Sequence, residues 1–161
     1  MPIRIRPATP DDAAVILGLI RELAEYERLL PEVTATEEDL RRTLFGDAPA
    51  AEVRLAEREG VSEPVAFALF FHTYSTFLGR RGLYLEDLFV QPAHRGFGIG
   101  RRLLEHLAAL AIERDCGRLE WTVLDWNEPA LRFYRRLGAV PMDAWTVQRV
   151  EGEALRALAG R

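Results

Sequence analysis

Residues 91–100, Gln91-Pro92-Ala93-His94-Arg95-Gly96-Phe97-Gly98-Ile99-Gly100, decide how the rest of this sequence is interpreted. The segment follows the apolar run Leu83–Val90 and leads into an amphipathic stretch from about Gly98 to Arg114. Glycines at alternate positions allow backbone amides to converge on an anion without interference from Cβ atoms. A helix N-terminus and the charges of Arg95 and Arg101 favour an anion at the same place. The segment is therefore either an ordinary tight turn or a phosphate-binding turn.

Two other phosphate motifs do not fit the spacing. The dinucleotide fingerprint would require a glycine at position 101 or 103, where the chain has Arg101 and Leu103. The P-loop requires a lysine, and this sequence contains none.

Outward from the loop, strand-like and helix-like segments alternate, which predicts an α/β fold. Short loops from Ala51 to Val90 predict an antiparallel meander, whereas the helix that follows Gly98 predicts a βαβ unit. Further helices are expected after the caps at Thr9 and Thr36, after Asn127, and at the C-terminus. The expected strands are Ile3–Arg6, Val53–Arg58, Pro64–Tyr74, Leu83–Val90, Leu119–Leu124 and Thr146–Val150.

Composition limits the class of protein. A chain of 161 residues that is 48% hydrophobic and 29% charged predicts one domain spanning residues 1–161. No apolar run is long enough for a signal peptide or a membrane span, so we expect a cytoplasmic protein with no membrane partner. The net charge of −4 argues against nucleic acid. His72, His94 and His106 lack ligand spacing and Cys116 is the only cysteine, so no metal and no intramolecular disulfide are expected.

The segment Arg95–Gly100 resembles the [Q/R]-x-x-G-x-[G/A] signature of the GNAT acetyltransferase superfamily. Other segments, in the same order along nearly the whole chain, resemble its spermidine/spermine (thialysine) N-acetyltransferase branch. The resemblance implies a mixed, mostly antiparallel sheet of six to seven strands flanked by helices, with a central βαβ unit for the cofactor. The segments that carry it are Ile5–Thr9, Glu22–Glu27, Leu83–Val90, Trp126–Pro129, Phe133-Tyr134 and Leu137–Ala139.

The resemblance implies acetyl-CoA as cofactor. The loop amides would hold the pyrophosphate, the pantetheine arm would pair with the strand that ends at Val90, and the Val90 amide would polarise the thioester carbonyl. Arg136 could equally be a solvated charge on a helix. The implied cofactor residues are Leu88, Phe89, Val90, Arg95, Gly96, Phe97, Gly98, Ile99, Gly100, Arg101, Asn127 and Arg136.

Two acids, Glu86 and Asp87, interrupt an apolar strand, where a carboxylate is costly unless it is paired or employed. Successive side chains of a regular strand point to opposite faces, so only one of the two can face a cofactor cleft. An alkylamine has a pKa of about 10.4 and needs a base before it can attack. The resemblance makes Glu86 that general base and gives Asp87 a part in shaping the amine pocket.

Tyr134 lies in a helical pattern with Phe133 and Leu137, and periodicity alone favours a packing role. The resemblance instead makes Tyr134 the acid that protonates the departing thiolate of coenzyme A. Its phenol, with a pKa of about 10, faces a thiol of about 8.5, which is a small uphill transfer.

For the amine, the resemblance points to Tyr26, Glu27, Glu120, Trp121 and Thr122, all of which could also be ordinary surface residues. The segment Met142–Trp145 departs from the acidic Glu-Gly-Trp stretch of the polyamine enzymes, which leaves polyamine specificity open.

The expected function is transfer of acetyl to a primary amine of a small cationic substrate, a diamine, a polyamine or a lysine-like amine such as thialysine, by direct attack in a ternary complex. Alternatives are another amine acceptor (an aminoglycoside, an amino acid or a protein N-terminus) and a non-catalytic acyl-CoA-binding module. A homodimer is expected because relatives pair through their last strands.

Overall fold

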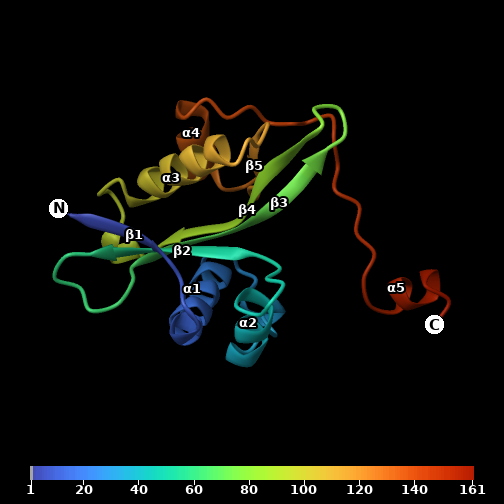
Figure 1. Ribbon diagram of the computed structural model, residues 1–161, viewed down its shortest axis with the longest axis horizontal. Coiled ribbons are helices and arrows are strands. Elements are labelled where there is room, and N and C mark those ends of the chain that lie inside the picture. Colours follow the sequence, from blue (N-terminus) through green and yellow to red (C-terminus); the bar gives the residue numbers. More distant parts are fainter. Residues whose placement is uncertain (1) are drawn as a thin grey trace. The chain divides into compact units, whose positions relative to one another are not determined.

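The computed structural model, which describes residues 2–161, is built around one mixed sheet with the strand order β1-β2-β3-β4-β5 (Figure 1). The first four strands pair antiparallel, and β5 pairs parallel to β4. The strands are β1 Ile3–Pro7, β2 Glu52–Arg58, β3 Ala66–Ser75, β4 Arg80–Val90 and β5 Leu119–Trp121.

Helices cover both faces of this sheet. Helices α1 (Ala13–Tyr26) and α2 (Glu37–Leu44) lie on one face, and α3 (Ile99–Glu113) lies on the other (Figure 1). Helix α3 connects β4 to its parallel neighbour β5, so the predicted βαβ unit is confirmed. Short 3-10 turns, η1 Pro10–Asp12, η2 Leu30–Glu32 and η3 Pro92–His94, precede or follow these elements.

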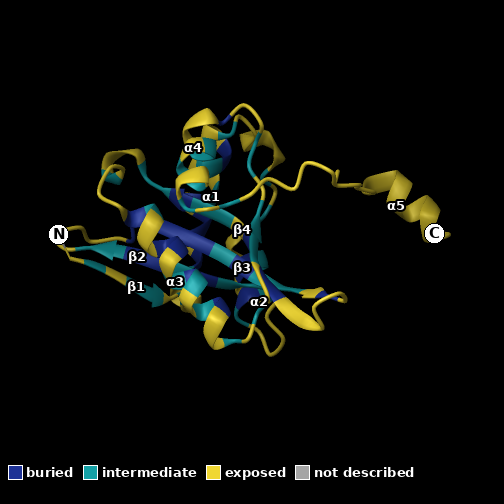
Figure 2. Ribbon diagram, turned by 90° about the horizontal axis from the view of Figure 1, so that it is seen from above, coloured by how far each residue is buried: buried dark blue, intermediate teal, exposed yellow. Residues whose placement is uncertain are grey.

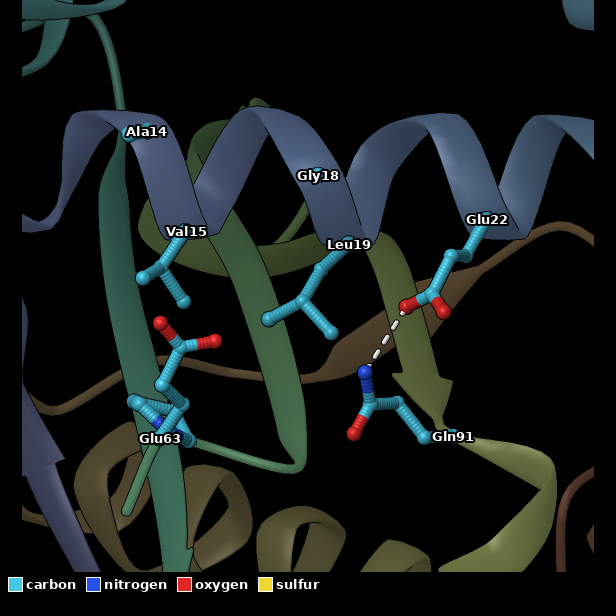
Figure 3. Close-up of a pocket in the computed structure, with 8 residues that line it drawn as sticks. Ala14, Val15, Gly18, Leu19, Glu22, Glu63 and Gln91 are labelled. Carbon is cyan, nitrogen blue, oxygen red and sulfur yellow. Dashed lines mark hydrogen bonds between the residues drawn. The ribbon is translucent and has the colours of Figure 1, made fainter.

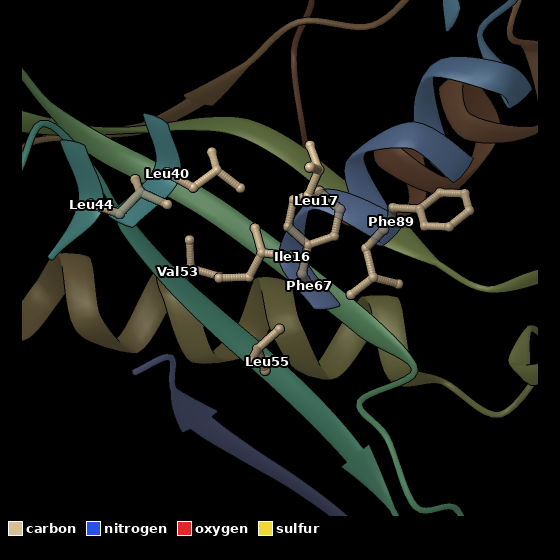
Figure 4. Close-up of a cluster of buried hydrophobic side chains, with 9 residues drawn as sticks. Ile16, Leu17, Leu40, Leu44, Val53, Leu55, Phe67 and Phe89 are labelled. Atoms are coloured by element: carbon tan, nitrogen blue, oxygen red, sulfur yellow. The ribbon is translucent and has the colours of Figure 1, made fainter. Parts of the chain in front are cut away.

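The core on the α1 face explains why these elements form. The apolar stripe of α1, with Ile16 and Leu17, packs on Leu55, Phe67 and Phe89 from three adjacent strands (Figure 4). Burial of large apolar side chains stabilises a fold by about 1.5–3 kcal/mol each. This core fixes the position of α1 against the sheet.

Local capping sets where α2 begins. The Thr36 hydroxyl accepts a hydrogen bond from the Asp39 amide at 3.2 Å, and the Asp39 carboxylate accepts one from the Thr36 amide at 2.9 Å. This reciprocal pair satisfies amides that have no partner inside the helix. The start predicted from Thr36 is confirmed.

The described chain divides into two units, Met1–Thr122 and Val123–Arg161. The second unit contains α4 (Glu128–Arg136) and α5 (Gly152–Leu158), and neither helix has a buried residue. Figure 2 shows α5 exposed along its length, in contrast to the buried middle of the sheet. The expectation of one domain over residues 1–161 stays a prediction.

The mixed, mostly antiparallel α/β class is confirmed, but the number of strands was wrong. The described residues form five strands rather than six to seven, because Thr146–Val150 is not a strand. Every residue of that segment is exposed, and Val147 keeps 77% of its surface in solvent. A strand needs a neighbour for its backbone hydrogen bonds, and none pairs with this segment in residues 2–161. The strand expected over Leu119–Leu124 also ends earlier, at Trp121.

Within the same described residues, no helix is sufficiently long and apolar to cross a bilayer.

Candidate functional site

The strands β4 and β5 pair over a short distance only. Their register runs from Leu83 opposite Leu119 to Leu85 opposite Trp121, where β5 ends. Strand β4 continues to Val90, so from Glu86 onward its β5-side edge has no strand partner in residues 2–161. Backbone groups on that edge can pair with an extended ligand.

A register shift in β4 places the two acids. Asp87 lies opposite Leu69 and Leu85 lies opposite Phe70, so Glu86 is an extra residue with no partner on β3. Cross-strand partners share a face, and Leu69 packs against the α1 core. The bulge therefore turns Asp87 toward α1.

Without the bulge, Asp87 would share the face of Leu85, two residues earlier. That face belongs to α3: Leu85 is opposite Phe70, and the guanidinium of Arg114, the residue that follows α3, lies 5.9 Å from the Phe70 ring centroid. Glu86 itself is exposed.

Asp87 is the electrostatically distinct member of the acid pair. Removal from solvent, together with the negative charges of Glu86 and Glu27, raises the pKa of its carboxyl from 3.8 to about 6. Burial likewise raises the pKa of Glu27, in the residue that directly follows α1. Two carboxyls with raised pKa values on one face favour a cationic ligand.

Arg95 links the glycine loop to α1. Its Nε donates to the Val90 carbonyl oxygen at 3.0 Å, and its guanidinium lies 5.0 Å from the Tyr26 ring centroid and 5.5 Å from that of Phe89. Because these contacts join the end of β4 to the end of α1, Tyr26 lies beside the loop expected to hold the cofactor.

The loop conformation depends on two glycines. Gly96 has φ 84° and Gly98 has φ 76°, a left-handed conformation that L-residues with a Cβ seldom adopt. Gly98 immediately precedes α3, so the first amides of that helix open beside the loop. At Gly100 an added Cβ would meet only Val90 Cγ2, at an ordinary 3.7 Å, so the fold itself does not require this glycine.

A contact between β2 and the glycine loop was not predicted from the sequence. The guanidinium of Arg58, the last residue of β2, lies 3.9 Å from the Phe97 ring centroid, and its Nη1 lies 3.0 Å from His94 Nδ1. Partners 36 residues apart leave no local signal in a sequence. Arg101, by contrast, pairs with Glu105 at 2.8 Å along its own helix.

The residues expected from β5 divide between the two faces. Glu120 is opposite Tyr84, whose ring is paired with Phe71 at 5.2 Å, and so lies on the α1 face as Asp87 does. Trp121, opposite Leu85, lies on the α3 face. Glu120 also pairs with Arg118 at 3.0 Å, and Thr122 is exposed.

The second unit carries the remaining candidates. Asn127 is buried and caps α4, with its Oδ1 accepting from the Ala130 amide at 3.4 Å. Tyr134 is half-buried beside Phe133, with ring centroids 5.5 Å apart. Arg136 is exposed in the last turn. These residues are described within their own unit only.

A shallow pocket of about 430 Å³ lies between α1 and the end of β4. Figure 3 shows Val15 and Leu19 as its apolar wall, with Glu63 pointing into it and Gln91 Nε2 donating to Glu22 Oε2 at 3.0 Å. The last contact is a further tie between α1 and the loop. The sequence had not singled out Glu22 or Gln91 as partners.

Among residues 2–161, no group of three or more histidine, cysteine, aspartate or glutamate side chains is arranged to hold a metal ion.

The model of the Acetyltransferase (GNAT) family matches residues 19–139. A thialysine N-epsilon-acetyltransferase from Bos taurus is 42% identical over 99% of this chain and 98% of its own length. An L-ornithine N5-acetyltransferase from Arabidopsis thaliana is 32% identical over 96% of this chain and 87% of its own.

Among solved structures, an integron cassette protein from the mobile metagenome of V. cholerae has a TM-score of 0.83 and 29% identity. That alignment covers 100% of this chain and 99% of the other.

Proposed function

The chain belongs to the GNAT acetyltransferase family and is an acetyltransferase, and we propose that it uses acetyl-CoA to acetylate a terminal primary amine of a small cationic substrate. The observation that carries the choice of acceptor is the pair Glu27 and Asp87, two carboxyls with raised pKa values on the α1 face. A buried carboxyl is stabilised in its charged form by a nearby cation, so this face suits an ammonium group.

The relatives narrow the acceptor. Those at 42% and 32% identity carry names that specify thialysine and L-ornithine, both of which are short diamino acids. We extend that acceptor class to this chain, with diamines and polyamines as neighbouring candidates. Tyr26, Glu120, Trp121 and Thr122 are the further residues proposed to line the amine site.

The chain's residues fit the proposed cofactor. The left-handed conformations at Gly96 and Gly98 leave the loop amides open toward an anion, which suits a pyrophosphate. The free edge of β4 from Leu88 to Val90 suits an amide-bearing arm such as pantetheine. When bound, acetyl-CoA supplies an activated thioester. Arg95, Phe97, Ile99, Arg101, Asn127 and Arg136 are the other residues proposed to contact it.

The proposed chemistry uses three groups of the chain. A carboxylate of the Glu86-Asp87 pair takes the proton from the substrate ammonium, and the resemblance favoured Glu86 for this role. The Val90 amide stabilises negative charge that develops on the carbonyl oxygen. The Tyr134 hydroxyl protonates the departing thiolate.

We also propose a homodimer in the cytoplasm. The support for the dimer is the exposed segment Thr146–Val150, which has no strand partner in residues 2–161 and contains the β-branched residues Thr146, Val147 and Val150. A second copy could supply the missing partner.

The decisive experiment measures release of free thiol from acetyl-CoA with a panel of amines: thialysine, L-ornithine, spermidine, an aminoglycoside and a peptide with a free N-terminus. We expect turnover with thialysine or L-ornithine at the lowest concentrations. Preference for the aminoglycoside or the peptide would replace the proposed acceptor. Binding of acetyl-CoA without amine-dependent turnover would indicate a binding module.

A further inference from the structure

The geometry points to Asp87, rather than Glu86, as the carboxylate that takes the proton from the substrate amine, with Glu27 as the positioning residue that adjusts its protonation. This inference rests on the proposed function, since it assigns the base for that reaction.

The first step of the argument is the bulge. Because Glu86 has no partner on β3, the alternation of faces is interrupted there, and Asp87 shares the face of Leu69 instead of that of Leu85. That face carries α1 and its terminal residues Tyr26 and Glu27. Asp87 is thus directed into the region proposed for the amine, whereas Glu86 is open to solvent.

The second step concerns the charged groups around Asp87. Glu86 on its own strand and Glu27 beside α1 are the charges that act on its carboxyl, and both are negative. Tyr84 of β4, Glu120 of β5, and Tyr26 and Glu22 of α1 are further titratable groups on this side of the sheet, and Glu22 accepts from Gln91. Arg95, a cation that joins the loop to α1, is turned toward the rings of Tyr26 and Phe89.

The third step is the match between base and substrate. Desolvation and like charge raise the pKa of Asp87 to about 6, close to neutral pH, where a general base is most effective. Compared with a carboxyl at the ordinary pKa of 3.8, the equilibrium for proton transfer from an alkylammonium to Asp87 is about a hundredfold more favourable.

The proton balance of the step is simple. The N–H bond of the substrate ammonium breaks, its proton passes to the Asp87 carboxylate, and the freed nitrogen lone pair forms the N–C bond to the acetyl carbon. The C–S bond then breaks, and Tyr134, the group proposed above, protonates the departing thiolate. The nitrogen loses its second proton to solvent as the amide forms, and Tyr134 regains a proton from solvent, so that the net products are the amide, free coenzyme A and one proton. Asp87 releases its proton to solvent before the next turnover.

One test needs no reaction. In the free protein, carbon NMR of the side-chain carboxyls across pH 3–9 should show one aspartate that titrates near pH 6, and the signal should vanish in Asp87→Asn. Glu27→Gln removes a like charge and should move that titration to lower pH. Glu25→Gln, the same change at an exposed position on α1, should leave it in place. An Asp87 titration below pH 5, or one that ignores Glu27, overturns the inference.

The second test uses turnover. Asp87→Asn should lower kcat by about 10²- to 10⁴-fold and abolish the acidic limb of the kcat/KM profile. Glu86→Gln should retain the limb but shift it to lower pH, because the Glu86 charge also raises the pKa of Asp87. Glu27→Gln should shift the limb to lower pH in parallel with the NMR titration. Retention of the limb in Asp87→Asn together with its loss in Glu86→Gln overturns the inference but keeps the proposed function. Absence of turnover with every amine overturns the proposed function, whatever the carboxyl titration shows.

Discussion

Asp87 should reduce the stability of the fold at neutral pH. Its folded pKa of about 6 lies above the ordinary 3.8, so the folded state binds the proton more tightly than the unfolded state does. The contribution of this group to the free energy of unfolding is therefore present at low pH and is lost as pH rises from about 4 to 6. The loss amounts to up to about 3 kcal/mol.

The corresponding prediction is that Asp87→Asn, which removes the buried charge, is more stable than the wild type at pH 8, by up to about 3 kcal/mol. Below pH 4 the two proteins should differ little. Urea unfolding at several pH values measures this, with Glu25→Gln as the exposed control. An Asp87→Asn variant that is less stable at pH 8 would mean that the carboxylate makes a structural contact.

Two of the loop glycines, Gly98 and Gly100, should differ in what they contribute to the fold and to the cofactor site. Gly98→Ala forces a Cβ into a left-handed conformation at φ 76° and should cost about 1–2 kcal/mol of stability. Gly100→Ala meets only ordinary contact and should keep the melting temperature. The signature that Arg95–Gly100 resembles also accepts alanine at this position, so Gly100→Ala should keep its acetyl-CoA affinity within about twofold. Gly98→Ala distorts the turn whose amides are proposed to hold the pyrophosphate, so its acetyl-CoA affinity should fall at least about tenfold. Thermal unfolding and calorimetric titration of both variants test this, and normal affinity in Gly98→Ala would remove this turn from the cofactor site.

At the scale of elements, the contact of Arg58 in β2 with the glycine loop should affect the binding of acetyl-CoA but not that of the amine. Arg58 stacks on Phe97 at 3.9 Å and reaches His94 at 3.0 Å, which holds the loop in place before a ligand arrives. Arg58→Met keeps much of the side-chain length but loses the charge. We expect acetyl-CoA to bind about twofold to thirtyfold more weakly, from a cation–π contribution of about 0.5–2 kcal/mol. The KM for the amine should stay within twofold. A larger change in that KM than in acetyl-CoA affinity would contradict the role of Arg58 in holding the glycine loop.

Most elements could be predicted from the sequence, because their apolar repeats and caps are local. Thr36 and Asp39, for instance, cap α2 over a separation of only three residues. The bulge at Glu86 could not be predicted, because it arises from the register against β3. In the sequence, Glu86 and Asp87 look like two successive residues of a regular strand. That single residue changes which acid faces α1, so the sequence located the acid pair but not the orientation of its members. The site roles themselves stay predictions.

At the scale of the whole molecule, the segment Thr146–Val150 lacks a strand partner within residues 2–161. The sequence predicted a closing strand here, yet all five residues are exposed and have no strand partner in residues 2–161. Sequence patterns report which face of a segment is apolar, and they do not report whether the partner strand belongs to the same chain. A strand with apolar residues and no partner is an open template for pairing.

The proposed dimer can be tested through the backbone of that segment. Val147→Pro removes an amide that an added strand would need as a donor, and it should convert the dimer into a monomer. Val147→Thr keeps both the amide and the branched side chain, so it should remain a dimer. Sedimentation equilibrium over a hundredfold range of concentration distinguishes the two. A wild type that is monomeric throughout, or a Val147→Pro variant that stays dimeric, would show that the segment is not the interface. In either case Val147→Pro should leave the fold of the protomer intact, because the segment has no backbone partner within residues 2–161.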